Sequence, residues 1–226
     1  LEVVPAGRAR ELGFDRSMIM SYGQDDRVCA YTSLAAMLGT KAELERTACC
    51  LLVDKEEIGS VGATGMQSRF FENVVAEIIS LQGDYTDIKL RRCLANSKML
   101  SSDVNAGYDP LFAEAFEKKN ASFCGRGVVF SKFTGSRGKS GSNDANAEYI
   151  AKLRKIMDDN NVNYQMAELG KVDVGGGGTI AYIMSLYGME VIDCGVPILN
   201  MHAPWEIASK ADVYEAKKCY YAFLEN

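Results

Sequence analysis

Val-Asp-Lys-Glu-Glu-Ile-Gly-Ser, at residues 53–60, follows an apolar run at residues 48–53 that ends abruptly in charge. This change of character is typical of a buried strand that carries polar residues to the edge of a sheet. Neighbouring side chains on an extended chain point to opposite sides, so Glu56 and Glu57 would have different tasks. One of them could bind a metal ion while the other takes a proton from water. A solvated strand end before a glycine turn is the simpler interpretation of the same residues.

The length and composition of the chain indicate one globular domain, or a large part of one. It has 226 residues, of which 47% are hydrophobic, an ordinary share for a soluble protein. The net charge of -5 disfavours nucleic acid as the main partner, because a phosphate-binding surface needs an excess of basic residues. No apolar run reaches the length of a membrane span, and no signal-peptide pattern occurs, so we expect no membrane partner.

The cysteines indicate a reducing environment. There are seven of them, an odd number, and they include no C-x-x-C pair. Four lie inside apolar runs, namely Cys29, Cys49, Cys50 and Cys194. Buried thiols in a reducing compartment explain this usage best, so we expect a cytoplasmic protein.

Strands alternate with helices along the chain, which predicts an α/β fold with a largely parallel sheet. The predicted strands cover residues 1–4, 47–53, 98–103, 127–133, 164–168 and 189–194. The predicted helices cover residues 25–39, 67–81, 87–94, 110–118, 143–158, 179–187 and 211–224. Apolar spacing in the first helix predicts a buried face made of Val28, Tyr31, Leu34, Ala35 and Leu38.

Residue types that bind metals occur at places expected to be strand ends or helix starts. They are Asp25, the pair Glu56 and Glu57, Asp103 and His202. In open α/β sheets ligands bind outside the carboxyl ends of the strands, so these side chains are expected to converge. Carboxylates together with imidazole suit zinc, cobalt or manganese. Each also has an ordinary alternative role: Asp25 as a helix N-cap, Asp103 in an Asx-turn, and His202 in a turn before a proline.

The same places carry the motifs of a known family. Residues 23–27, Gly-Gln-Asp-Asp-Arg, resemble the G-L-D-N-R motif of the aspartyl aminopeptidase and aminopeptidase I family of dinuclear zinc metallopeptidases. Residues 54–60 resemble its D-H-E-E-[IV]-G-S motif, and residues 101–104 resemble its S-A-D-M motif. Residues 196–203 resemble its G-[IV]-P-x-L-x-M-H-S motif. All of these occur in the family's order and span most of the chain.

The resemblance implies a three-layer αβα zinc-peptidase fold with a mixed, largely parallel central sheet. It also implies two divalent metal ions, zinc in the first place, with cobalt or manganese as alternatives. Asp25 would bridge the two ions, Glu57 and His202 would complete one site, and Asp103 would belong to the other. The metal ions would polarise the scissile carbonyl and lower the pKa of the attacking water, and Glu56 would act as general base that relays the proton to the leaving amine.

The chain departs from the family pattern in its histidines. The family has a second metal-binding histidine upstream, before an inserted oligomerisation domain, whereas His202 is the only histidine here. We therefore expect residues 1–226 to be the C-terminal portion of a peptidase domain, with the upstream segment and the inserted domain absent. The fold of this portion would be incomplete, and we expect activity to require the upstream segment. Asp26 replaces the usual Asn, and Asn105 and Tyr108 occupy a region where relatives often have histidines.

Three residues are candidates for binding substrate. The resemblance places Lys132 near the substrate pocket, where it could pair with an acidic N-terminal side chain; a solvated surface lysine is the alternative. Gly177 and Thr179 belong to a glycine-rich turn before a predicted helix, which could hold a peptide carbonyl or simply connect strand to helix. The loop 135–140 is too short between its glycines for a nucleotide-binding P-loop.

The expected function is that of a metalloaminopeptidase that removes N-terminal residues from peptides, with a possible preference for acidic ones. One alternative is a related dinuclear zinc aminopeptidase or deacylase. An alternative of another class is a non-catalytic binding or assembly subunit that has kept the fold. The family resemblance also implies homo-oligomers, specifically dodecamers formed through the inserted domain.

Overall fold

A four-stranded mixed sheet forms the centre of the computed structural model, which describes residues 1–137, 140–171 and 173–226. Its strand order is β3 (Lys98–Ser101), β9 (Glu190–Gly195), β5 (Val128–Ser131) and β8 (Tyr164–Met166). The pairs β3–β9 and β5–β8 are parallel, whereas β5 and β9 run antiparallel. The prediction of a mixed, largely parallel central sheet is therefore confirmed, and its strands lie within a few residues of the predicted ranges.

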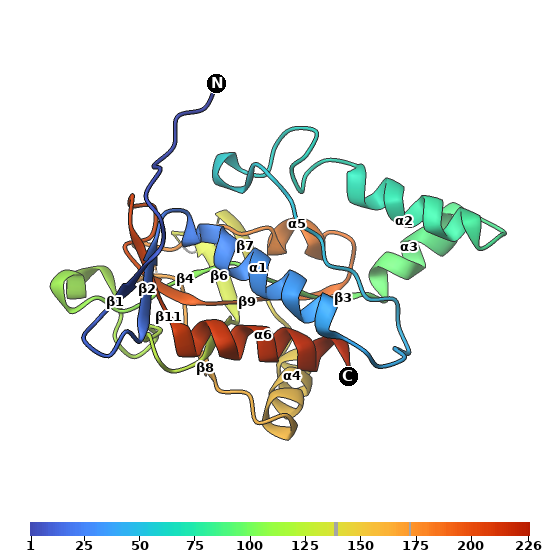
Figure 1. Cartoon of the computed structure of the whole chain (residues 1–226). Coiled ribbons are helices and arrows are strands. Elements are labelled where there is room, and N and C mark those ends of the chain that lie inside the picture. The colour runs from blue at the N-terminus through green and yellow to red at the C-terminus, as the bar shows by residue number, and fades with distance from the viewer. Residues whose placement is uncertain (138–139, 172) are drawn as a thin grey trace.

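Helices cover both faces of this sheet. Residues Ile192 and Cys194 of β9 pack into one apolar cluster with side chains from α1 (Gln24–Gly39), α4 (Ala147–Asp159) and α6 (Lys210–Leu224). Val191, which points to the opposite face, packs into a second cluster with side chains from α5 (Ala181–Ser185) and α3 (Asp87–Ala95). In Figure 1, α1 and α6 lie side by side along the front of the sheet and α5 lies above it. This layering confirms the predicted three-layer α/β fold.

A second, mainly antiparallel sheet contains the two strands that flank His202 and the short strand that follows Asp103. Its order is β1 (Arg10–Leu12), β2 (Met18–Ser21), β11 (Glu206–Ser209), β10 (Pro197–Leu199) and β4 (Asn105–Ala106). A hairpin is formed by β6 (Phe133–Ser136) and β7 (Ser140–Asp144). Most of these strands were not predicted, because runs of two to five residues are too short to show an alternating pattern.

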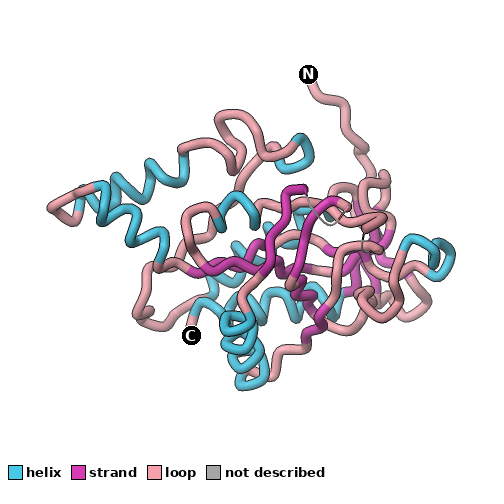
Figure 2. The backbone as a smooth tube through the Cα atoms, turned by 180° about the vertical axis from the view of Figure 1, so that it is seen from behind, coloured by secondary structure: helices cyan, strands magenta, loops and turns pink. Residues whose placement is uncertain are grey.

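The hairpin of α2 (Phe70–Leu81) and α3 projects from the body of the molecule. Figure 2 shows it from the other side, together with the long loop that precedes it. Residues Pro110–Ala115 form a short 3₁₀ helix, labelled η2, where a longer helix was predicted. The helix predicted to begin at Asn143 begins at Ala147, because residues 140–144 belong to β7. In the described ranges no helix is long and apolar enough to cross a membrane.

Three predictions about local structure are wrong. Residues 1–9 form no strand, and the strands at the N-terminal end are β1 and β2 instead. Residues 47–53 are not a strand either, since no strand in the described part of the chain pairs with them, and Leu52 is exposed. Cys49 in the same run is also exposed rather than buried, although all seven cysteines are free thiols.

The buried face of α1 is rotated relative to the predicted one. Tyr31 and Leu38 are exposed, whereas the buried side chains are those of Gln24, Val28, Cys29, Thr32 and Ala36. Small side chains on this face allow α1 to lie close against α6, so that the helix buries its small residues and leaves large apolar ones outside. The apolar spacing alone could not distinguish these two faces.

The loop considered at residues 135–140 falls partly outside the described residues, which do not include Gly138 and Lys139, nor Val172 elsewhere in the chain.

Candidate metal centre

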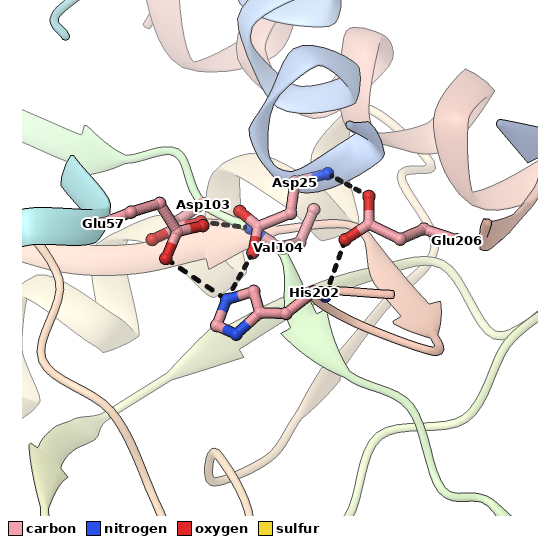
Figure 3. A network of polar contacts seen from close by, with 6 residues as sticks. All are labelled: Asp25, Glu57, Asp103, Val104, His202 and Glu206. Carbon is pink, nitrogen blue, oxygen red and sulfur yellow. Dashed lines mark hydrogen bonds and ion pairs between the residues drawn. The ribbon is translucent and has the colours of Figure 1, made fainter. Parts of the chain in front are cut away.

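Three of the predicted ligands meet in one cluster. Asp25, Glu57 and His202 each offer a ligand atom, and these atoms lie within 4.8 Å of one another. His202 Nε2 lies 3.0 Å from Asp25 Oδ2 and 3.3 Å from Glu57 Oε2. Figure 3 shows the imidazole pointing at both carboxylates. Side chains far apart in the sequence therefore converge as expected.

A second cluster shares Asp25 with the first. It consists of Asp25, Asp26 and Asp103, whose ligand atoms again lie within 4.8 Å of one another. Asp26 was noted in the sequence only as a replacement for the usual Asn, and its participation was not predicted. Its Oδ1 is buried and has no hydrogen-bond partner among the described residues. A buried carboxylate oxygen without a partner beside two further carboxylates is a position that a cation would stabilise.

Three of the ligand candidates lie on different segments. Asp25 lies in the first turn of α1, where its backbone is not helical. Asp103 follows β3 by two residues, and the backbone N–H of Val104 donates to its Oδ1 at 2.8 Å. His202 lies in the turn between β10 and β11 with a positive φ of 65°. The prediction that candidate residues gather at strand ends and helix starts holds for these positions.

The two adjacent glutamates lie in a turn rather than at the end of a strand. Residues Glu56–Ile58 form the 3₁₀ turn η1, bounded by Lys55 and Gly59, which both have a positive φ. The N–H of Gly59 donates to the carbonyl of Glu56 at 2.8 Å and closes the turn. Successive residues of such a turn point in different directions, so Glu57 joins the His202 cluster while Glu56 does not. Glu57 therefore lies in the cluster and Glu56 outside it, and the separate tasks of the two residues stay predictions.

The electrostatics of the centre show carboxylates packed against each other. Burial, followed by the charge of Glu57, raises the pKa of Asp25 to about 6, while His202 opposes the rise. Burial, followed by the charges of Glu57 and Asp25, likewise raises the pKa of Glu56 to about 6. The pKa of Asp103 is raised well above its usual range by burial and by Asp26 and Asp25. Such mutual repulsion is relieved by a cation, and the donor set of oxygens and one imidazole nitrogen fits zinc.

Sequence reasoning missed Glu206, which is hydrogen-bonded to the backbone of two ligand candidates. This residue of β11 is 2% exposed. Its Oε2 accepts from the backbone N–H of Asp25 at 2.9 Å, and its Oε1 accepts from the backbone N–H of His202 at 2.8 Å. The available signal was a charged residue four positions after the histidine, between Trp205 and Ile207.

The candidate substrate residues lie on neighbouring segments. Lys132, between β5 and β6, forms an exposed ion pair with Asp144. The carbonyl of Gly177 accepts from the N–H of Gly135, so the glycine-rich turn packs along β6. Thr179 is buried, and its hydroxyl donates to Asp193 Oδ1 at 2.5 Å. Their roles in binding substrate stay predictions.

A small recess adjoins the second carboxylate cluster. Its lining includes Asp103, Asn105, Thr134, Thr179 and Asp193. Asp193 accepts from the hydroxyls of Thr179 and Thr134, and burial raises its pKa to about 6. The recess brings Thr179 close to the proposed ligands, whereas Lys132 is not part of its lining.

Comparison with known proteins gives a consistent family match. Residues 1–224 match the family model described as aminopeptidase I zinc metalloprotease (M18). A protein of Clostridium acetobutylicum named probable M18 family aminopeptidase 1 is 66% identical over 226 residues, which are 100% of this chain and 48% of that protein. The chain thus spans about half the length of the curated relatives it matches.

Solved structures agree with this match. The crystal structure of aminopeptidase I from Clostridium acetobutylicum is 64% identical with a TM-score of 0.91, and the match covers 99% of this chain and 48% of that one. The crystal structure of an M18 family aminopeptidase from Thermotoga maritima is 44% identical with a TM-score of 0.94, over 98% of this chain and 49% of that one. These similarities extend to the whole described fold.

Proposed function

Because the chain belongs to the aminopeptidase I zinc metalloprotease (M18) family, we propose that it carries the metal-binding and proton-transferring residues of a zinc aminopeptidase. The observation that supports this most directly is the position of Asp25, whose carboxylate belongs to both ligand clusters at once. A carboxylate shared in this way is suited to bridge two cations. Asp26 and Asp103 lie on one side of it, and Glu57 and His202 lie on the other.

We propose two zinc ions as the cofactor. Glu57, His202 and Asp25 would hold one ion, and Asp25, Asp103 and Asp26 would contribute to the other. Zinc bound there would supply a Lewis acid that polarises a carbonyl group and acidifies a water molecule. Cobalt and manganese accept the same donor types and are the alternatives to test.

Glu56 is the general base in this proposal. It is half-buried, belongs to neither ligand cluster, and lies close enough to Asp25 and His202 to respond to their charges. A carboxylate that is free of ligand duty can take a proton from the attacking water and deliver it to the leaving amine. The turn η1 presents Glu56 and Glu57 in different directions, which lets adjacent residues perform these separate tasks.

The substrates would be peptides with a free N-terminus, and acidic N-terminal residues are the finer proposal. Lys132 is the cation proposed to pair with an acidic side chain. Since Lys132 already pairs with Asp144 at the surface, an acidic substrate would have to compete with that carboxylate. The recess lined by Thr179 and Asn105 beside Asp103 is the proposed location for the first residue of the peptide.

We further propose a homo-oligomer that works in a reducing compartment such as the cytoplasm. A solved structure that shares the fold, from Saccharomyces cerevisiae, is described as the mApe1 dodecamer. The free state of all seven cysteines supports the reducing compartment.

The proposal is tested by Glu56→Gln in the full-length protein, with bound zinc and peptide hydrolysis measured on the same sample. We expect zinc content to stay unchanged and turnover to fall by about 100-fold or more, because Gln cannot take the proton. Glu72→Gln on α2, where Glu72 pairs with Arg69, is the control and should leave both quantities unchanged. A protein that holds no zinc and is indifferent to Glu56→Gln would instead be a binding or assembly subunit.

A further inference from the structure

Glu206 is a buried carboxylate whose hydrogen bonds go to the backbone of two metal-ligand residues. Glu206 is 2% exposed. A carboxylate that is removed from water needs hydrogen-bond donors from the protein. The donors are the N–H groups of Asp25 and His202, at 2.9 and 2.8 Å, one to each of its oxygens. Figure 3 shows Glu206 beside Asp25 and His202, on the opposite side from Glu57.

The two donors belong to different segments of the chain. Asp25 begins α1, whereas His202 lies in the β10–β11 turn. Their side chains meet in one cluster, with His202 Nε2 3.0 Å from Asp25 Oδ2. The carboxylate of Glu206 therefore connects the backbones of two residues whose side chains must stay a fixed distance apart to hold one cation.

The position of Glu206 is itself well fixed. Strand β11 pairs with β2, with Glu206 opposite Ser21. The side-chain amide of Gln24 donates to the carbonyl of Ile19 at 2.9 Å and lies 3.4 Å from the carbonyl of Glu206. The side chain of Gln24 thus links the start of α1 to β2 and β11. The side chain of Glu206, in turn, links β11 to the turn that contains His202.

The turn needs such support because His202 has a left-handed backbone. Its φ is 65°, a conformation that residues other than glycine rarely adopt. The imidazole is also largely exposed, so packing contributes little to its orientation. A charge-assisted hydrogen bond to the N–H of this residue is a strong restraint on the turn.

We propose that Glu206 is a positioning residue that sets the spacing of Asp25 and His202 and thereby the affinity of the Asp25–Glu57–His202 cluster for a divalent cation. This inference rests on the proposed function, in which that cluster binds zinc. Groups that orient ligands in this way typically change metal affinity by about 10-fold to 100-fold when they are replaced.

The test is a titration of the chain with Co²⁺, followed by its visible absorption, with Zn²⁺ as competitor. We compare the wild type with Glu206→Gln and Glu206→Asp. Gln keeps the size of the side chain, but its NH₂ group is a donor and cannot accept from one of the two backbone N–H groups. Asp keeps the negative charge, but its side chain is too short to reach both N–H groups. We expect both variants to bind Co²⁺ about 10-fold to 100-fold more weakly, with a changed absorption band as His202 leaves its position.

The comparison of the two variants separates positioning from charge. If Glu206→Asp binds as tightly as the wild type while Glu206→Gln does not, only the negative charge matters and the positioning role is overturned. Equal affinity in all three proteins also overturns it. A wild-type chain that binds no Co²⁺ would overturn the proposed metal centre itself, which is a different result.

Asp212 provides a matched control. It is fully buried and accepts from the N–H groups of Gly125 and Gly127 at 2.6 and 2.7 Å, the same arrangement at a place without metal ligands. Asp212→Asn should lower thermal stability as much as Glu206→Gln but leave Co²⁺ affinity unchanged. Parallel losses of affinity in both variants would mean that Glu206 acts only through general stability.

A measurement on the wild type covers the case in which the variants do not fold. Amide hydrogen exchange of the metal-free chain should show slow and similar exchange at Asp25 and His202, since both N–H groups are bound to one buried carboxylate. If the N–H of His202 exchanges as fast as those of other exposed turns, its hydrogen bond to Glu206 does not restrain the turn, and the proposal is contradicted.

Discussion

Asp25 lies where two groups of metal-ligand candidates meet, and its surroundings show which parts of the site could be predicted from the sequence. Asp25, Glu57 and His202 could be found because their residue types are typical of metal ligands and they occur in recognisable motifs. Glu206 could not, because its role depends on the pairing of β2 with β11, which joins distant segments. Asp26 was visible as a substitution, but its closeness to Asp103 depends on how α1 begins.

The raised pKa of Asp193 predicts that the stability of the chain depends on pH. Burial raises its pKa to about 6 in the folded chain, from an ordinary value of 3.8. Between about pH 4 and pH 6 the unfolded chain therefore binds fewer protons at this group, and stability falls as pH rises through that range. The loss is roughly 3 kcal/mol, since one pKa unit corresponds to about 1.4 kcal/mol. Asp193→Asn cannot ionise and should lack this loss.

The measurement is chemical denaturation of both chains, freed of metal by a chelator, at several pH values. The difference in unfolding free energy between Asp193→Asn and the wild type should grow in favour of the variant from about pH 4 to pH 6 and then stay level. A difference that is constant over this range would show that Asp193 has the same pKa in the folded and unfolded chains.

Lys132 predicts substrate preference. If it pairs with an acidic N-terminal side chain, Lys132→Ala should lower kcat/KM for aspartyl substrates by roughly tenfold relative to leucyl substrates. Asp144→Asn should do the opposite, because it removes the carboxylate that competes for the same ammonium group. Lys155→Ala, which breaks a similarly exposed pair with Asp159 on α4, is the control. Equal effects of Lys132→Ala on both substrates would exclude Lys132 from specificity.

At the scale of elements, most helices and the strands of the central sheet were predictable, whereas most strands of the second sheet were not. Helices α1, α3 and α6 and strands β3 and β9 lie within a few residues of the predicted ranges. Residues 47–53 have the apolar composition of a strand, yet a strand exists only where a neighbour accepts its hydrogen bonds, and composition cannot supply that neighbour. The same argument explains β10 and β11, which are strands because β2 and β4 pair with them.

A substitution of Gly195, the last residue of β9, is expected to disturb the site through the backbone. A Cβ at Gly195 would lie 1.6 Å from the carbonyl oxygen of Asp103, which cannot move without moving its carboxylate. We expect Gly195→Ala to lower the unfolding free energy by about 3 kcal/mol. We also expect it to weaken binding of the cation at Asp103, measured by Co²⁺ titration. Stability and affinity equal to the wild type would show that this close approach is not required.

Gly39→Ala at the end of α1 is the matched control. The nearest atom to a Cβ there is Cδ2 of Tyr221 at 4.0 Å, and the position lies in a helix. Ala is favoured over Gly in helices by roughly 0.5–1 kcal/mol, so this variant should be as stable as the wild type or slightly more stable.

At the scale of the whole molecule, the proposed metal centre joins segments that the fold holds together only in part. Its proposed ligands come from the start of α1, from η1, from the loop after β3 and from the β10–β11 turn. The turn η1 has no buried residue. The fold class and the types of the candidate residues were predictable from the sequence. The convergence of these segments depends on packing between α1, α6 and both sheets, and no local sequence pattern shows that packing.

A cation that binds only the folded arrangement must therefore stabilise the chain. At a free Zn²⁺ concentration 100 times the dissociation constant, the unfolding free energy should rise by about 2.7 kcal/mol. For a chain of 226 residues this corresponds to an increase in Tm of roughly 5–10 °C, which differential scanning calorimetry can measure. The exposed Cys49 and the neighbouring Cys50 could bind Zn²⁺ by themselves, so the experiment uses a background in which both are replaced by Ser. His202→Ala in that background should lose most of the increase, because the first cluster then has only carboxylates. An equal increase with and without His202 would mean that Zn²⁺ stabilises the chain from another place, and that the four segments are held together without the cluster on which they converge.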